Sequence, residues 1–230
     1  MSMQYSIVIP VFNESDSILP LYSEIRKTMD KIDGAYQIIF VNDGSVFFDL
    51  KYLEANMDSN IVKIINLPVK LGQTNALARG LEGAVGNVVI SMDGDLQDNP
   101  EYIQYFIDKL SQGFDVVCGR RVNRKDAKNK ILLSKIGNFV QNLIFHTGLH
   151  DISCTYRAYK KECVRSLKLI RNGYHRYIPF LLIREGYKVT EINIEQRERV
   201  YGRSKYSCWK VVDAVFTFLY IIFYIVRKRI

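Results

Sequence analysis

The chain has 230 residues, of which 48% are hydrophobic and 24% are charged, and this composition fits one large globular domain, alone or with a small appendage, and excludes a disordered chain. Its net charge of +8 hides an asymmetry, because residues 1–115 carry 8 basic and 16 acidic side chains whereas residues 116–230 carry 24 and 8. The basic half has no zinc-finger, ribonucleoprotein or helix-turn-helix signature, which argues against nucleic acid and favours a membrane surface or a phosphorylated ligand.

In the first half, short apolar runs alternate with segments of helical period, a pattern typical of a βαβ sheet with covered faces. The expected strands comprise residues 6–11, 37–41, 62–67, 88–92 and 115–118. The expected helices comprise residues 18–32, capped by Ser15, Asp16 or Ser17, and residues 74–84.

The second half is less regular. Residues 131–145 predict an amphipathic helix flanked by lysines, which suits either a core helix with a solvated face or a membrane surface. Residues 177–184 predict a helix and residues 188–194 a strand, and a polar loop follows at residues 195–207.

The segment at residues 211–226 is apolar except for Asp213 and Thr217, with Trp209 before it and a cationic cluster after it. As a helix it would be about 24 Å long, which is marginal for a bilayer core of roughly 30 Å. Because its flanks are those of a membrane segment, we expect a membrane-associating helix; the alternative is a helix docked on the core or on a partner. We therefore expect a catalytic domain at residues 1–207 and this helix at residues 208–230.

Four cysteines lie far apart without a CxxC pair, which supports neither a disulfide scaffold nor a zinc ribbon, and we expect buried thiols in a reducing compartment. The first residues show neither a basic n-region nor a cleavage site, so we expect no secretory signal. The expected location is the cytoplasmic face of a membrane.

Polar residues follow four successive strand candidates, where open α/β sheets bind their ligands. In the fourth of these loops, Asp93 and Asp95 are separated by one glycine, so both carboxylates can face the same side and hold one divalent cation. Mg²⁺ held there would bridge the two phosphates of a nucleotide. The alternative is a solvated acidic turn that caps a helix at Pro100.

Several motifs occur in one order: VIPVFNE at residues 8–14, VNDGS at 41–45, KLG at 70–72, MDGDLQD at 92–98, DVVCGRR at 115–121, DISCTYR at 151–157, HRYIP at 175–179 and RVYGRSKY at 199–206. Together they resemble the family 2 glycosyltransferases, and within them the enzymes that use a polyprenyl phosphate. The resemblance implies the GT-A fold, with a mostly parallel sheet and helices on both faces.

The resemblance also implies site residues. Asp93, Asp95 and Gln97 would hold Mg²⁺ or Mn²⁺, with Asp95 also catalytic. Pro10, Phe12, Glu14 and Asp43 would join Asp93, Asp95 and Arg199 around a UDP or GDP sugar. Arg199 and Lys205 would act on the donor diphosphate in catalysis, and Arg121, Lys130 and Ser134 would bind the acceptor phosphate. Gln73 departs from the family pattern, which commonly has Lys there.

The expected reaction is inverting transfer of a sugar from a nucleoside diphosphate to a polyprenyl phosphate, such as dolichyl or undecaprenyl phosphate, at the membrane surface. A phosphate oxygen is largely ionised at neutral pH, so no strong general base is required. Two alternatives stay open. The acceptor could be a glycan or protein hydroxyl, with Asp98 or Asp95 as base, or the chain could be an inactive membrane-associated nucleotide-binding subunit. A homo-oligomer or a membrane partner subunit is compatible with each.

Overall fold

The computed structural model describes residues 3–46, 48–123, 142, 147–167, 173–198, 217 and 220. The strands are β1 (Tyr5–Val11), β2 (Tyr36–Asn42), β3 (Val62–Asn66), β4 (Val88–Ser91), β5 (Val116–Val122), β6 (Arg157–Lys160) and β7 (Val189–Glu195). The helices are α1 (Ser15–Met29), α2 (Leu50–Ala55), α3 (Gln73–Glu82), α4 (Ile103–Ser111), α6 (Lys161–Ser166) and α7 (Ile178–Arg184), with the 3₁₀ turns η1 (Pro100–Tyr102) and η2 (Tyr174–Tyr177).

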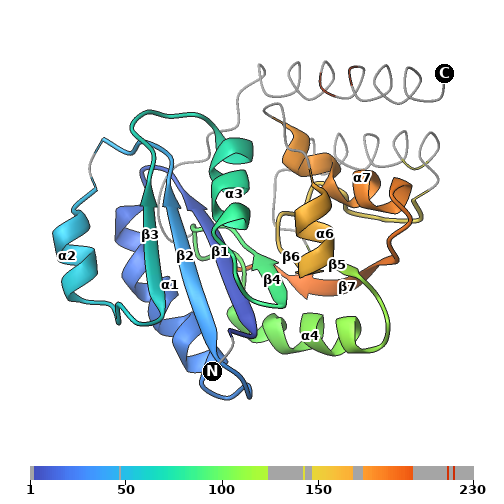
Figure 1. The fold of residues 1–230 in the computed structure, drawn as a ribbon, viewed down its shortest axis with the longest axis horizontal. Coiled ribbons are helices and arrows are strands. Elements are labelled where there is room, and N and C mark those ends of the chain that lie inside the picture. The colour runs from blue at the N-terminus through green and yellow to red at the C-terminus, as the bar shows by residue number, and fades with distance from the viewer. Residues whose placement is uncertain are drawn as a thin grey trace.

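The seven strands form one mixed sheet in the order β3-β2-β1-β4-β6-β5-β7 (Figure 1). β3, β2, β1 and β4 are parallel to one another, and β7 is parallel to β5. β6 is antiparallel to both of its neighbours, β4 and β5. The four parallel strands therefore present their carboxyl ends at one edge of the sheet.

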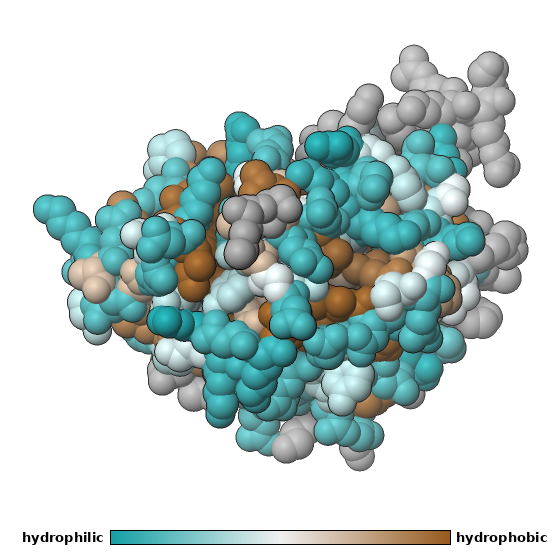
Figure 2. Space-filling model, turned by 60° about the horizontal axis from the view of Figure 1, so that its bottom comes forward, coloured by the Kyte–Doolittle hydropathy of each residue, from teal (hydrophilic) through white to brown (hydrophobic). Residues whose placement is uncertain are grey.

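Helices cover both faces of this sheet, as predicted. Alternate residues of β1 and β2 pack with α1, α2 and α4 in one hydrophobic core, and the residues between them pack with α3, α6 and α7 in a second core. Gly80 lets α3 lie against β1, because a Cβ at this position would collide with the side chain of Val8. Viewed from the side on which α4 lies, the surface is mostly hydrophilic, with hydrophobic side chains in between (Figure 2).

The predicted strands and helices in the first half lie within about three residues of the observed ones at most ends. Strand β5 continues to Val122, beyond the predicted end at residue 118, because it pairs with β7 along its length. The predicted cap of α1 is wrong. Glu14 occupies the cap position, and the hydroxyl of Ser17 instead donates to the carbonyls of Glu14 and Gly94, at 2.7 and 2.5 Å.

The sequence did not predict β6, α2 or α6. A helical segment does begin at Pro100, where the side chain of Asn99 accepts a hydrogen bond from the N–H of Glu101. Three of the four cysteines, Cys118, Cys154 and Cys163, are free and buried as expected, and burial raises the pKa of each thiol.

The predicted helix at residues 131–145 and the predicted membrane-associating helix at residues 208–230 lie outside the described residues, apart from single positions. Within the part of the chain that the structure describes, no helix combines the length and the apolar character that a membrane span requires. Of the C-terminal segment, Thr217 is buried and Tyr220 is exposed.

Candidate functional site

The loops that follow β1, β2, β3 and β4 contact one another at the carboxyl edge of the parallel strands. The N–H of Asn13 donates to Ser45 Oγ, at 2.9 Å, and the N–H of Val46 donates to Asn13 Oδ1. The loop after β4 approaches the loop after β1 at Gly94, where a Cβ would collide with the side chain of Val11. The topology thus brings the four polar loops together, as the sequence predicts.

Asp43, predicted to contact the nucleotide, holds the loop after β3. It is buried, and its Oδ1 accepts hydrogen bonds from the N–H groups of Leu71 and Gly72, at 2.7 and 3.0 Å. Its Oδ2 accepts a further bond from Gly72. Gly72 has φ of 94°, a conformation that favours glycine. Asp43 therefore shapes the wall of the site, and its contact with a nucleotide stays a prediction.

Phe12, predicted to lie beside the base, lies under a cation. The Nζ of Lys70 stands 4.1 Å from the centre of its ring. This cation–π contact joins the loop after β1 to the loop after β3. Lys70 is exposed, so a positive charge stands beside Phe12 at this edge of the sheet.

Three aspartates cluster directly after β4. Asp95 and Asp98 are buried, Asp98 Oδ2 accepts the N–H of Asp93, and Asp95 Oδ1 accepts the N–H of Gln97. Burial, with repulsion from Asp98 and Asp95, raises the pKa of Asp93 to about 7. Burial also raises the pKa of Asp98 to about 6. These carboxylates repel one another, so a bound cation would relieve an unfavourable charge.

The residues present fit a divalent cation. Carboxylate oxygens are the ligands that Mg²⁺ and Mn²⁺ prefer, and Mg²⁺ commonly takes one or two carboxylates together with substrate phosphates. Asp93 and Asp95 supply such a pair. Among the described residues, no group of three or more His, Cys, Asp or Glu side chains forms a metal site, so the remaining ligands would have to come from elsewhere.

The segment after β7 crosses this aspartate loop. Gln196 donates to Asp98 Oδ1, at 3.1 Å, and the backbone N–H of Arg197 donates to the carbonyl of Gln97. The side-chain amide of Gln97 donates in turn to the carbonyl of Arg197. Gln97, predicted to bind metal, therefore connects two loops, and its role as a ligand stays a prediction.

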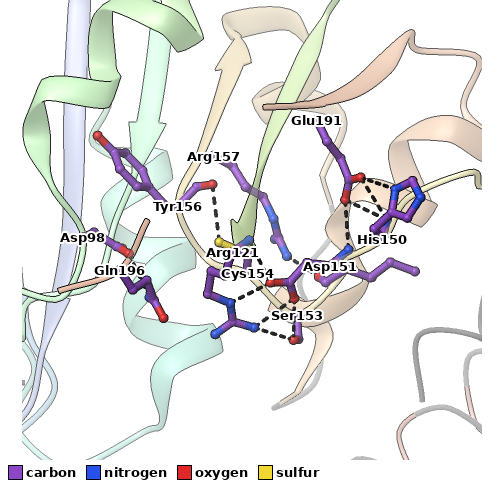
Figure 3. Close-up of polar contacts among 11 residues, drawn as sticks. Asp98, Arg121, His150, Asp151, Ser153, Cys154, Tyr156, Arg157, Glu191 and Gln196 are labelled. Atoms are coloured by element: carbon purple, nitrogen blue, oxygen red, sulfur yellow. Dashed lines mark hydrogen bonds and ion pairs between the residues drawn. The ribbon is translucent and has the colours of Figure 1, made fainter. Parts of the chain in front are cut away.

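Arg121, predicted to bind the acceptor phosphate, forms a two-pronged ion pair with Asp151 (Figure 3). Its Nε donates to Oδ2 at 2.6 Å and its Nη2 to Oδ1 at 2.9 Å, and Nη2 also reaches Ser153 Oγ. The backbone N–H of Asp151 donates to Glu191, which also pairs with His150. Arg121 is therefore held firmly at the end of β5.

Two buried residues of the second half have structural links that the sequence did not assign. Arg157 is fully buried on β6 and donates to the carbonyls of His175 and Ile152, both at 2.7 Å. His175 is buried too, and its Nδ1 lies 2.7 Å from the hydroxyl of Thr74. Arg157 ends the motif at residues 151–157 in a largely polar stretch, so no apolar pattern marks it as a buried residue.

Pro10 lies on β1 and Glu14 directly after it, beside Gly94, so both are at the predicted edge. The structure thus groups Pro10, Phe12, Glu14, Asp43, Asp93, Asp95 and Gln97 along one edge of the sheet. Lys130, Ser134, Arg199 and Lys205 lie outside the described residues.

Comparison with known proteins gives a consistent result. Residues 6–167 match the profile of the family described as glycosyl transferase family 2. A protein of Proteus mirabilis is 34% identical over 216 residues, which cover 93% of this chain and 66% of the relative. A protein of Pectobacterium atrosepticum is 35% identical over 217 residues, with the same coverage. A protein of Pseudomonas paraeruginosa is 32% identical over 213 residues, or 92% of this chain and 62% of the relative.

All three relatives are named undecaprenyl-phosphate 4-deoxy-4-formamido-L-arabinose transferase. The chain spans slightly less than two thirds of their length. Among solved structures, glucosyl-3-phosphoglycerate synthase of Mycobacterium tuberculosis, in complex with Mn²⁺, UDP and glucosyl-3-phosphoglycerate, superposes with a TM-score of 0.66 at 17% identity, covering 87% of this chain and 73% of that one. The same synthase with Mg²⁺ and UDP gives a TM-score of 0.65. At this identity the likeness concerns the fold.

Proposed function

Because the chain belongs to glycosyl transferase family 2, we propose that it transfers a sugar from a nucleoside diphosphate to a polyprenyl phosphate at a membrane surface. The observation that carries this proposal is the pair Asp93 and Asp95, directly after β4, among three other loops at the carboxyl edge. The names of the relatives support the lipid phosphate acceptor, and the complexes of the structural neighbour support a nucleotide sugar with a divalent cation.

On the donor side, Asp93 and Asp95 would hold Mg²⁺ or Mn²⁺. Such an ion stabilises the negative charge on a departing diphosphate. Asp43 keeps the loop at Leu71 and Gly72 in place, which gives the donor a preformed wall. Pro10, Phe12 and Glu14 lie along the same edge, so we assign them, with Arg199, to the nucleotide and its sugar.

On the acceptor side, an oxygen of the lipid phosphate would attack the anomeric carbon. A bond forms from that oxygen to the carbon while the bond from the carbon to the diphosphate oxygen breaks, so the anomeric configuration inverts. The attacking oxygen is already ionised at neutral pH because the second pKa of a phosphate monoester is about 6. We assign Arg121, Lys130 and Ser134 to the acceptor phosphate, and Arg199 and Lys205 to the donor diphosphate.

Transfer to a hydroxyl group would need a general base, and the environment of Asp98 does not suit it for that role. Asp98 is 1% exposed, and its two oxygens accept hydrogen bonds from the N–H of Asp93 and from Gln196. A base must lie within hydrogen-bond reach of the proton that it removes. This burial argues against Asp98 as that base.

The proposal is tested by incubating the protein with radiolabelled UDP and GDP sugars, a short polyprenyl phosphate and Mg²⁺ or Mn²⁺, and then extracting the lipid. We expect label in the lipid phase. Asp93→Asn and Asp95→Asn should each lower the rate by at least about a hundredfold, because charge on the leaving diphosphate loses its counter-ion.

Circular dichroism and the midpoint of thermal unfolding serve as controls that both variants are folded. Label on a glycan or protein instead of the lipid would support transfer to a hydroxyl. No transfer with any donor, despite nucleotide binding, would support an inactive subunit. Full activity in EDTA would exclude the cation.

A further inference from the structure

Gln73, the first residue of α3, contacts one member of the aspartate pair, Asp93. Its side-chain amide donates a hydrogen bond to Oδ1 of Asp93, at 3.0 Å. An amide is neutral, so this bond contacts the carboxylate without placing a positive charge beside it. A lysine at the same position would add a full positive charge next to the carboxylate.

The residues on both sides of Gln73 are fixed by buried groups. The N–H of Gly72 donates to both carboxylate oxygens of Asp43, at 3.0 and 2.9 Å. The hydroxyl of Thr74 accepts the N–H of Gly173, at 2.9 Å, and lies 2.7 Å from Nδ1 of His175. Thr74 is 1% exposed. The exposed side chain of Gln73 therefore extends from a rigid turn.

We propose that Gln73 is a positioning residue for the cation site: it orients Asp93 for a divalent ion without neutralising it. The inference rests on the proposed function in one respect, the assignment of Asp93 to the cation. A carboxylate that accepts a hydrogen bond from a neutral amide can still bind a metal ion with its charge. A lysine paired with the same carboxylate would compete with the metal ion for that carboxylate.

The test compares Gln73→Lys, Gln73→Leu and the wild-type protein. Binding of Mn²⁺ is measured by electron paramagnetic resonance of the free ion, in the presence of UDP and, separately, of GDP. We expect Gln73→Lys to weaken Mn²⁺ binding by about tenfold or more, because an ammonium group repels the ion at short range. Gln73→Leu should weaken it by about fivefold, the equivalent of one ordinary hydrogen bond.

Gln104→Lys is the matched control. On α4, the amide of Gln104 donates to Asp108 Oδ1 in the same way, at 2.6 Å, on an exposed surface. This variant makes the same change of charge beside an aspartate that the mechanism does not use, so its Mn²⁺ affinity should equal that of the wild type.

A kinetic signature separates positioning from a purely structural effect. In Gln73→Lys, saturating Mn²⁺ should restore kcat to within about twofold, because the lysine competes for Asp93 but does not remove it. Asp93→Asn should not be rescued in this way. A loss of kcat in Gln73→Lys that no Mn²⁺ concentration restores would overturn the inference.

Three other results would also overturn the inference. Gln73→Lys could bind Mn²⁺ as tightly as the wild type, or Gln104→Lys could lose as much Mn²⁺ affinity as Gln73→Lys. The wild type could also fail to bind Mn²⁺ with either nucleotide. If Mn²⁺ binding follows the expected order but no sugar reaches a polyprenyl phosphate, the proposed function fails and the role of Gln73 stands.

Discussion

Two ion pairs of this chain differ strongly in their exposure to solvent. The Arg121 and Asp151 side chains are 16% and 6% exposed, whereas those of Arg79 and Glu82, which also form an ion pair, are 60% and 64% exposed. Burial by itself would lower the pKa of Arg121, but the hydrogen bonds and the charge of Asp151 raise it above its ordinary value, so the guanidinium stays charged. Removing the partner of a buried carboxylate strongly destabilises the folded protein, because the charge stays buried without compensation. Removing the partner of a solvated carboxylate has little effect on stability.

We therefore predict that Arg121→Ala lowers the free energy of unfolding by about 3 kcal/mol, because Asp151 keeps a buried charge. Arg79→Ala should lower it by less than about 1 kcal/mol. Urea unfolding of both variants measures the two effects. If Arg121→Ala were as stable as the wild type but needed more lipid phosphate for half-maximal rate, its main role would be the acceptor phosphate.

At the scale of single elements, the apolar runs predicted the parallel strands because both faces of such a strand are buried. β6 escaped prediction because its four residues, Arg157–Lys160, include two cations. Its identity depends on pairing with β4 and β5, which lie far away in the sequence. The helices α2 and α6 have six residues each, too short for a periodic pattern to be recognised.

Three strands meet at one carboxylate. Asp115 Oδ1 accepts a hydrogen bond from Nζ of Lys160, at the end of β6, and its Oδ2 accepts the N–H of Lys188, just before β7. The bond from Lys160 and that from the N–H of Lys188 lower the pKa of Asp115. A carboxyl group with a lowered pKa in the folded state stabilises the protein above its unfolded pKa, and this stabilisation is lost as the pH falls through the folded value.

Asp115→Asn should consequently reduce the free energy of unfolding at pH 7, by less than about 1 kcal/mol because the pair is partly solvated. The difference from the wild type should shrink as the pH falls below about 3.9, where the carboxyl group itself takes up a proton. Urea unfolding at several pH values measures this difference in the free energy of unfolding. In a Lys160→Met background, Asp115→Asn should have little further effect on stability. A difference that stayed constant down to pH 2 would contradict the role of the Asp115 charge.

At the scale of the whole molecule, the site combines segments that are distant in the sequence. Local patterns placed the four loops on one edge because parallel strands share their carboxyl ends. They could not show that Gln196 would bond to Asp98, 98 positions earlier, or that Asp43 would be occupied by backbone N–H groups. The first contact depends on how the second half of the chain packs on the first, and the second on how the loops after β2 and β3 meet. No periodic pattern encodes either arrangement.

Two described residues of the C-terminal segment, Thr217 and Tyr220, contact the domain next to η2. Thr217 is buried and lies against Gly173, where a Cβ would come within 2.9 Å of its hydroxyl oxygen. The ring of Tyr220 lies 6.4 Å from that of Tyr174. The neighbouring Gly173 N–H is bonded to Thr74, next to Gln73. Thr217 and Tyr220, two positions of the segment predicted to associate with a membrane, therefore lie beside residues 173–174, which Thr74 links to the start of α3.

Deleting residues 208–230 should release the protein from vesicles of anionic phospholipid and lower activity on a long-chain acceptor more than hydrolysis of the sugar nucleotide.

Since deletion also removes Thr217 from Gly173, a second variant tests charge alone: Arg227, Lys228 and Arg229 all changed to Gln. Each cation near an anionic surface contributes about 1 kcal/mol, so this variant should bind anionic vesicles weakly and neutral vesicles as the wild type does. Cosedimentation measures both. A truncated protein that still sediments and uses long-chain acceptor normally would assign membrane association to residues 131–145, whose lysine-flanked pattern is the other candidate in the sequence.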